Sequence, residues 1–303
     1  MTDLGTLGGS SSNANGINNI GQVVGTSSFA GDQIGHAFIY DHGNMTDLGT
    51  LGGRSSSAWG INDRGQVVGY SETLDGSTHA FLYSEGRMTD LGTSPFFNFF
   101  NLRINNNGDI AGTYNVNDTG RAFLYSAGQT TDLGTLGGAY DISAGGLAPH
   151  STANGINDSG QIVGYSITDD VRFYHSFLSS NGAMTDIHDS SGGMVISRAT
   201  DINNKGQIVG SGNISFLYDG GQAYDLNDLV DDPRRKILLP SGINDTGQII
   251  ASACATNNLF ACSAVLLTPG DTITPAVPEP RAYMMLLAGL GIVGTMARWR
   301  KMK

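Results

Sequence analysis

The sequence predicts an all-β fold built from six copies of one unit, and three observations support this prediction. Glycine accounts for 44 of the 303 residues and proline for only 8, which is typical of a chain with many tight turns. Short runs rich in Val, Ile, Phe and Tyr alternate with Gly and Asn, as in short β-strands joined by hairpins. A segment of about 45 residues recurs along the chain, which is a period of repeat architectures.

Three sequence blocks define the repeat. The first block is Gly-Ile-Asn-Asn-Ile-Gly-Gln-Val-Val-Gly, and its copies lie at residues 16–25, 60–69, 103–112, 155–164, 201–210 and 242–251. The second block begins with His-Ala-Phe in the first two units, and the third reads Met-Thr-Asp-Leu-Gly. The sixth unit lacks the third block, whereas the chain begins with a copy of it at residues 1–5.

Each unit is expected to form four antiparallel strands. In the second unit we expect strands at Ala58–Asn62, Gln66–Ser71, His79–Ser84 and Arg87–Leu91. Asn and Asp bond locally to backbone, and Gly accepts a positive φ, so the Asn-Asp-x-Gly segment between the first two strands fits a hairpin turn.

Four strands per unit of about 45 residues is the spacing of a propeller blade. The coils of a parallel β-helix, the rival architecture, are shorter and lack tight hairpins. We therefore predict a six-bladed β-propeller over residues 1–270, closed by its N-terminal strand, and followed by a linker and one C-terminal hydrophobic helix.

Charge and residue pattern argue against several functions. The chain has 16 basic and 27 acidic residues, a formal net charge of −11, so we expect no nucleic-acid partner. His36, His79 and His175 occupy equivalent repeat positions, so a structural role is favoured over catalysis, and the repeated Asp residues are expected to bond to turn backbone. No metal-ligand cluster, nucleophile elbow or phosphate-binding loop is recognisable, so we predict no catalytic residues, no metal and no cofactor.

Two sets of residues stand apart from the repeat. Cys254 and Cys262 fall on strands expected to pair in the last blade, and an exported chain would favour a disulfide between them over two buried thiols. The second set replaces a Gly-rich run after the second unit and is either a ligand patch or is buried against the next blade: Phe96, Phe97, Phe99 and Phe100.

The C-terminal tail has three parts in a fixed order. The linker, residues 271–281, ends in the sorting motif Val277, Pro278, Glu279 and Pro280. Residues 282–297 carry no charge and are expected to form a transmembrane helix. Residues 298–303 would form a basic cytoplasmic tail that stops transfer through the membrane with Arg298, Arg300, Lys301 and Lys303.

This tail resembles the PEP-CTERM sorting domain. The resemblance implies export, transient anchoring in the cytoplasmic membrane with the C-terminus inside, and removal of the tail by an exosortase, in bacteria that make exopolysaccharide and often biofilm. With its His36-Ala37-Phe38 and Gly-Ile-Asn-Asp-x-Gly-Gln segments, the body resembles the HAF-repeat family of extracellular proteins, which implies a location but no established reaction.

These observations predict an exported repeat protein of the cell surface or extracellular matrix that acts as a non-enzymatic interaction scaffold. The alternative is a lectin-like propeller that binds exopolysaccharide. A hydrolase with its site at the mouth of the central channel is the third possibility, and a cluster of non-repeated carboxylates there would favour it.

Overall fold

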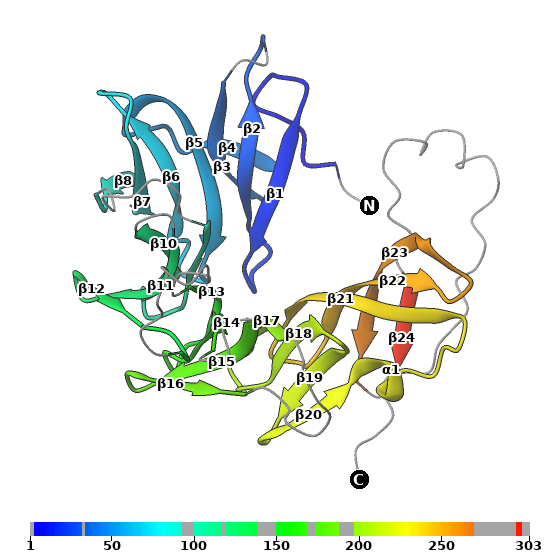
Figure 1. Ribbon diagram of the computed structural model, residues 1–303. Coiled ribbons are helices and arrows are strands. Elements are labelled where there is room, and N and C mark those ends of the chain that lie inside the picture. The colour runs from blue at the N-terminus through cyan, green and yellow to red at the C-terminus, as the bar shows by residue number, and fades with distance from the viewer. Residues whose placement is uncertain are drawn as a thin grey trace, which may run out of the picture.

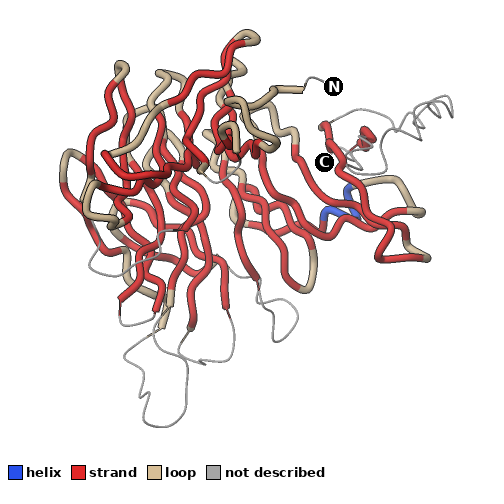
Figure 2. Tube along the Cα trace, turned by 90° about the horizontal axis from the view of Figure 1, so that it is seen from above, coloured by secondary structure: helices blue, strands red, loops and turns tan. Residues whose placement is uncertain are grey.

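A computed structural model describes residues 3–31, 34–92, 100–116, 119–137, 150–168, 174–187, 197–269 and 295–298. In these residues the regular structure is almost entirely β, with six four-stranded sheets and one short helix, α1 (Leu226–Leu229). Figure 1 shows the sheets following one another around a central axis, and Figure 2 shows from above that strands make up most of the described trace. The predicted all-β, six-bladed β-propeller is confirmed.

In the first three blades the strands follow the repeat. Blade one contains β1 (Ser12–Ile17), β2 (Val23–Ser28), β3 (Gly35–Asp41) and β4 (Asn44–Asp47). Blade two contains β5 (Gly52–Ile61), β6 (Val67–Thr73), β7 (Thr78–Ser84) and β8 (Arg87–Asp90). Blade three contains β9 (Phe100–Ile104), β10 (Ile110–Val116), β11 (Thr119–Ser126) and β12 (Gln129–Asp132).

The last three blades repeat this order, and helix α1 joins blades five and six. Blade four contains β13 (Ser151–Ile156), β14 (Ile162–Ile167), β15 (Tyr174–Ser180) and β16 (Ala183–Asp186). Blade five contains β17 (Ser197–Ile202), β18 (Ile208–Gly212), β19 (Ser215–Asp219) and β20 (Gln222–Asp225). Blade six contains β21 (Arg235–Ile243), β22 (Ile249–Ala255), β23 (Asn258–Thr268) and β24 (Thr295–Arg298).

A bulge in the first strand of the blade explains the glycine that ends the first sequence block. In blade two the register of β5 against β6 shifts between Ala58 and Gly60. The bulge brings backbone so close that a Cβ at Gly69 would lie 2.0 Å from the Ser57 carbonyl oxygen. Only glycine fits this position without a shift of the backbone.

Apolar side chains fill the junctions between successive blades. Five clusters of buried residues are found in the described chain, one at each junction from blades one and two to blades five and six. At the first junction, for example, Val24 of blade one packs with Ile61 of blade two. The blades are therefore held together face to face, as in other stacked repeats.

The structure differs from the prediction at the ends of the blade series. The fourth strand of the sixth sheet is β24, which pairs in parallel with β23 over Val265–Thr268. Met1 and Thr2 lie outside the described residues, and Asp3–Gly5 forms a turn in which the Gly5 N–H donates to Asp3 Oδ1 at 3.0 Å. Closure of the sixth sheet by the N-terminal strand is therefore wrong for the described chain, because β24 occupies that edge.

The predicted linker and most of the predicted helix lie outside the described residues. The structure does not describe residues 271–281, the linker, or residues 282–294 of the expected helix. The end of that expected helix, Thr295–Ala297, starts β24. Among the residues that the structure does describe, no helix is long and apolar enough to span a bilayer.

Candidate functional site

Six turns line one mouth of the central channel. Each turn joins the first two strands of its blade and begins with the residues Asn18, Asn62, Asn105, Asn157, Asn203 and Asn244. In blade two Asn62 Oδ1 accepts the backbone N–H groups of Arg64 and Gln66 at 3.1 and 3.0 Å, and Gly65 takes a φ of 72°. The side chain of Asn thus holds its own turn in shape, as the sequence predicts for Asn-Asp-x-Gly.

The same Asn side chains also tie each blade to the next. Asn18 Nδ2 donates to the carbonyl oxygen of Asn62 at 3.0 Å, and Asn62 Nδ2 donates to that of Asn105 at 2.9 Å. Asn105, Asn157 and Asn203 repeat this bond toward the next blade at 2.9–3.1 Å. One amide therefore satisfies both a local turn and a contact between blades.

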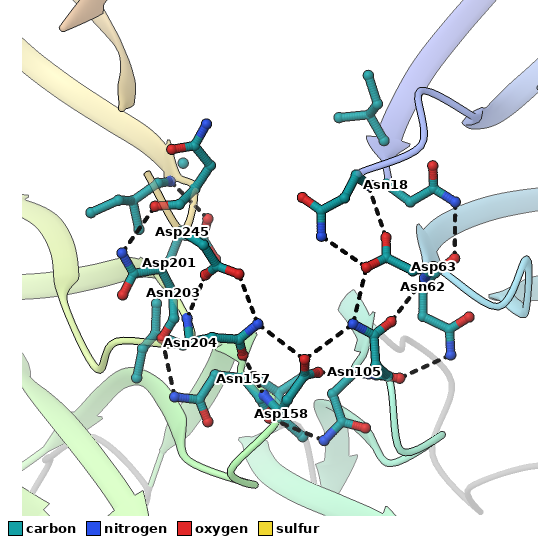
Figure 3. A pocket seen from close by; sticks show the side chains of 18 of the residues that line it. Asn18, Asn62, Asp63, Asn105, Asn157, Asp158, Asp201, Asn203, Asn204 and Asp245 are labelled. Atoms are coloured by element: carbon teal, nitrogen blue, oxygen red, sulfur yellow. Dashed lines mark hydrogen bonds between the residues drawn. The ribbon is translucent and has the colours of Figure 1, made fainter. Parts of the chain in front are cut away.

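The second residue of each turn forms a belt around the channel mouth, in which amide and carboxylate side chains alternate. In chain order the belt consists of Asn19, Asp63, Asn106, Asp158, Asn204 and Asp245. The Asn106 N–H donates to Asp158 Oδ1 at 2.8 Å, and Asn106 Nδ2 donates to Asp63 Oδ2 and Asp158 Oδ2, both at 3.1 Å. Figure 3 shows these bonds running from blade to blade around the mouth.

The belt surrounds a polar cavity of about 560 Å³, whose walls also include Ile17, Ile61 and Ile202. Burial opposes ionisation of Asp63, but the Asn19 and Asn106 donors outweigh it and hold the pKa of this carboxyl below its ordinary value. The Asp63 carboxyl is therefore ionised at neutral pH, and its oxygens accept hydrogen bonds from the neighbouring blades.

Two charged residues break the repeat, and one of them, Asp201, lines the cavity. The position before the repeated turn Ile is glycine in four blades, but it is Arg103 in blade three and Asp201 in blade five. Burial raises the pKa of Asp201 to about 6, although the Ile243 N–H, 3.0 Å from Asp201 Oδ2, and the charge of Arg103 act in the opposite direction. Burial likewise lowers the pKa of Arg103, whose Nη1 donates to the Leu102 carbonyl oxygen at 3.1 Å.

Sequence reasoning missed both residues. Aligning the six first blocks would have revealed them, because Arg103 and Asp201 stand where Gly16, Gly60 and Gly155 stand in other copies. A single non-repeated carboxylate of the described chain thus lines this cavity, and not the cluster that would favour a hydrolase.

The repeated histidines lie on the third strand of their blades and are not among the residues that line this cavity. His36 Nδ1 lies 2.9 Å from Asp47 Oδ1, and the same pairing joins His79 to Asp90 at 2.8 Å. Asp47 Oδ1 also accepts the Gly49 N–H at 2.8 Å, which is the turn bond expected of the repeated Asp. His175 pairs with Asp186 in the same way, and in blade three Arg121 takes the place of His and contacts Asp132.

The other predicted site residues are placed as follows. Cys254 and Cys262 face each other on β22 and β23 and form a disulfide. Phe96, Phe97 and Phe99 lie outside the described residues, and Phe100 begins β9. The motif residues Val277–Pro280 and the basic residues Arg300, Lys301 and Lys303 also lie outside them, whereas Arg298 ends β24. In the described ranges no three His, Cys, Asp or Glu side chains are grouped to hold a metal ion.

Solved structures with a similar fold share little sequence with this chain. The β-propeller domain of the trilobed protease from Pyrococcus furiosus matches with a TM-score of 0.53 and 10% identity, covering 84% of this chain and 80% of that chain. The puromycin-hydrolyzing peptidase of Mycobacterium tuberculosis matches with a TM-score of 0.53 and 12% identity, covering 86% of this chain and 44% of that one. TolB from Acinetobacter baumannii matches with a TM-score of 0.48 and 12% identity, covering 78% of this chain and 61% of TolB. At these identities the likeness to the first two, whose TM-scores exceed 0.5, shows the propeller fold alone.

Sequence comparison identifies the tail. No curated protein matches the chain. The family model of the PEP-CTERM protein-sorting motif matches residues 276–301, and the resemblance of the body to the HAF-repeat family stays a prediction. The chain therefore carries a PEP-CTERM sorting motif, which indicates an exported protein that is anchored transiently at its C-terminal end and processed by an exosortase-type enzyme.

Proposed function

We propose that this protein is a non-enzymatic interaction scaffold of the cell surface or extracellular matrix. Its tail would act as a temporary anchor with the basic end in the cytoplasm, and an exosortase-type enzyme would remove it. The sorting motif at residues 276–301 carries the proposal for location. The belt supports a scaffold role, because the amides and carboxylates at the channel mouth are engaged in bonds between blades and leave few groups for chemistry.

Export and processing can be tested in one bacterial host with and without an exosortase-type enzyme. The full chain should be found outside the cytoplasm in a shortened form when the enzyme is present, and should stay membrane-bound at full length when it is absent. Glu279→Ala should block shortening, whereas the matched linker change Thr272→Ala should not. A chain that stays cytoplasmic in both hosts would contradict the proposal.

A second candidate function, binding of an acidic polysaccharide, is favoured by one cluster between blades four and five. The Arg198 Cζ lies 4.9 Å from the ring centre of Tyr165 and 5.2 Å from that of Tyr174, and the Arg198 side chain has no ion pair in the described chain. Cation–π contacts with two rings hold the guanidinium in place while its N–H donors stay available.

His150 contacts the same two rings, with its ring centre 5.9 Å from that of Tyr165 and 5.7 Å from that of Tyr174. Its ring stacks on Tyr165, its Nδ1 accepts the Gly120 N–H at 3.2 Å, and its Nε2 lies 2.9 Å from Thr152 Oγ1. Burial, aided by the charge of Arg198, lowers the pKa of His150, so this ring is neutral near pH 7. A fixed guanidinium beside aromatic rings suits a sugar that bears a carboxylate.

Binding of polygalacturonate, compared with neutral dextran, tests this second function. Arg198→Gln should weaken polygalacturonate binding at least about tenfold, since a charge-assisted hydrogen bond contributes about 1.5–3 kcal/mol. Arg87→Gln, which removes an equal charge from an exposed site on blade two, should have little effect. Equal losses in both variants would show that net charge alone governs the interaction, and no binding by the unmodified chain would exclude this function.

A further inference from the structure

The first and sixth blades each present a face that is covered in every other blade. Ile17 of blade one is 68% exposed, whereas four of its five counterparts, Ile61, Ile104, Ile202 and Ile243, are at most 8% exposed and the fifth, Ile156, is partly buried. Ile250 of blade six is 54% exposed, whereas the residues at its position in the other blades are at most 1% exposed: Val24, Val68, Ala111, Val163 and Val209. The five buried clusters pack these two positions against each other between neighbouring blades. Ile17 and Ile250 therefore lack partners that their counterparts have.

The hydrogen-bond belt is incomplete between the same two blades. Asn244 Nδ2 donates to Gln248 Oε1 at 2.8 Å but, unlike Asn203 Nδ2, has no carbonyl of a following blade to bond in the described chain. The Asp245 carboxylate accepts hydrogen bonds from Asn204, but the Asp245 backbone N–H has no partner among the described residues. Asn19 donates to Asp63, but its Oδ1 atom likewise has no partner among them. Figure 3 shows the bonded series ending at Asp245 on one side and at the turn of Asn18 on the other.

We propose that the exposed face of blade six is a docking surface for the exposed face of blade one of the same chain. In the docked state Ile250 packs against Ile17, and Asn244 Nδ2 donates to the Asn18 carbonyl oxygen. The Asp245 N–H then donates to Asn19 Oδ1, and the free hydrogen of Asn19 Nδ2 binds the Asp245 carboxylate. This junction repeats the five that are present, and it needs no N-terminal strand in the sixth sheet.

Three features identify blade one as the partner. The order of amides and carboxylates continues across the junction, because the belt ends with Asp245 and begins with Asn19. The apolar contact matches the other junctions in residue type as well as in position. Both faces belong to one chain, so their local concentration exceeds that of a second copy, whose docking would generate an open filament.

Cross-linking of the full chain tests the junction. The third residues of neighbouring turns are exposed, so Ile20→Cys with Thr246→Cys probes the proposed junction, and Arg64→Cys with Asn107→Cys probes the existing junction of blades two and three. A short bismaleimide should link both pairs within one chain to similar yield. The native cysteines do not compete for the reagent, because they are joined to each other in a disulfide. If only the Arg64→Cys/Asn107→Cys pair is linked, the proposal is wrong. If the Ile20→Cys/Thr246→Cys variant forms covalent dimers, the face of blade six binds a second copy of the chain.

A substitution in the Ile20→Cys/Thr246→Cys chain tests the apolar contact. Ile250→Asp would place a carboxylate against Ile17 in the docked state and should lower the cross-linking yield at least fivefold. Leu74→Asp alters a residue that is 89% exposed on blade two and should leave the yield unchanged. If Ile250→Asp leaves the yield at the level of Leu74→Asp, Ile250 does not face blade one and the proposed docking is wrong.

Discussion

Replacing Asn106 by Asp tests how much the belt contributes to stability. The change keeps the shape of the side chain but removes the two N–H donors that bind Asp63 and Asp158 at 3.1 Å. A hydrogen bond to a charged group contributes about 1.5–3 kcal/mol, and the lower value suits this partly buried site. Two such bonds amount to about 3 kcal/mol, and repulsion among three neighbouring carboxylates adds to the loss.

The assay is urea unfolding of the full chain at pH 7. We expect Asn106→Asp to lower the free energy of unfolding by about 3 kcal/mol through a lower midpoint with an unchanged m value. Asn44→Asp adds the same charge at an exposed position on β4 and should change it by less than about 0.5 kcal/mol. Equal stabilities of the two variants at pH 7 would refute a stabilising belt.

Acid should reduce the difference between Asn106→Asp and the unmodified protein. The folded-state pKa of Asp63 lies below its ordinary value, so its stabilising effect is present above about pH 4 and is lost as the pH falls through the folded-state pKa. The unmodified protein thus loses the benefit of the belt in acid, whereas the carboxyl introduced by Asn106→Asp becomes protonated there and regains a donor. A deficit that is as large at about pH 3.5 as at pH 7 would show that the loss does not depend on the charges of the belt.

Three further predictions concern other parts of the fold. Because burial raises the pKa of Asp201 to about 6, the folded protein binds this proton more tightly than the unfolded chain, and stability should fall as the pH rises from about 4 to 6. Asp201→Asn should abolish this part of the pH dependence in a series of urea midpoints, and an unchanged slope would contradict it. Cys262→Ser should lower the free energy of unfolding by about 2–3 kcal/mol and make the urea midpoint insensitive to reductant. A variant whose urea midpoint still changes with reductant would contradict the bond to Cys254. Gly164→Ala should lower the free energy of unfolding, measured by thermal denaturation, by about 1–3 kcal/mol, because its Cβ would lie 1.8 Å from the Thr152 carbonyl oxygen. Unchanged stability would show that the bulge relaxes to accept the methyl group.

The repeat made the blades predictable from the sequence. The strand expected at Gln66–Ser71 is found as β6, Val67–Thr73, and the strand expected at His79–Ser84 is found as β7, Thr78–Ser84. Local signals suffice here, because turn residues and alternating apolar residues act within one blade. The disulfide was also within reach, because strand pairing places Cys254 opposite Cys262.

The belt could not be predicted in the same way. Asn and Asp in a turn indicate a bond to nearby backbone, and this reading is correct for Asn62. Their bonds to the next blade depend on how the turns line up around the axis, which is a property of the assembled blades. The fourth strand of blade six was missed for a related reason, since β24 comes from a distant segment with no trace of the repeat.

The alternation of side chains around the mouth restricts how the number of repeats can change in evolution. Loss of blade two would bring Asn19 next to Asn106, two amides whose Nδ2 donors both bind Asp63 and would then face each other without a carboxylate to accept them. Loss of blade three would bring Asp63 next to Asp158 and leave two negative charges in contact without a donor. Repeats can therefore be gained or lost without penalty only in neighbouring pairs, so related chains with this belt should differ by an even number of blades.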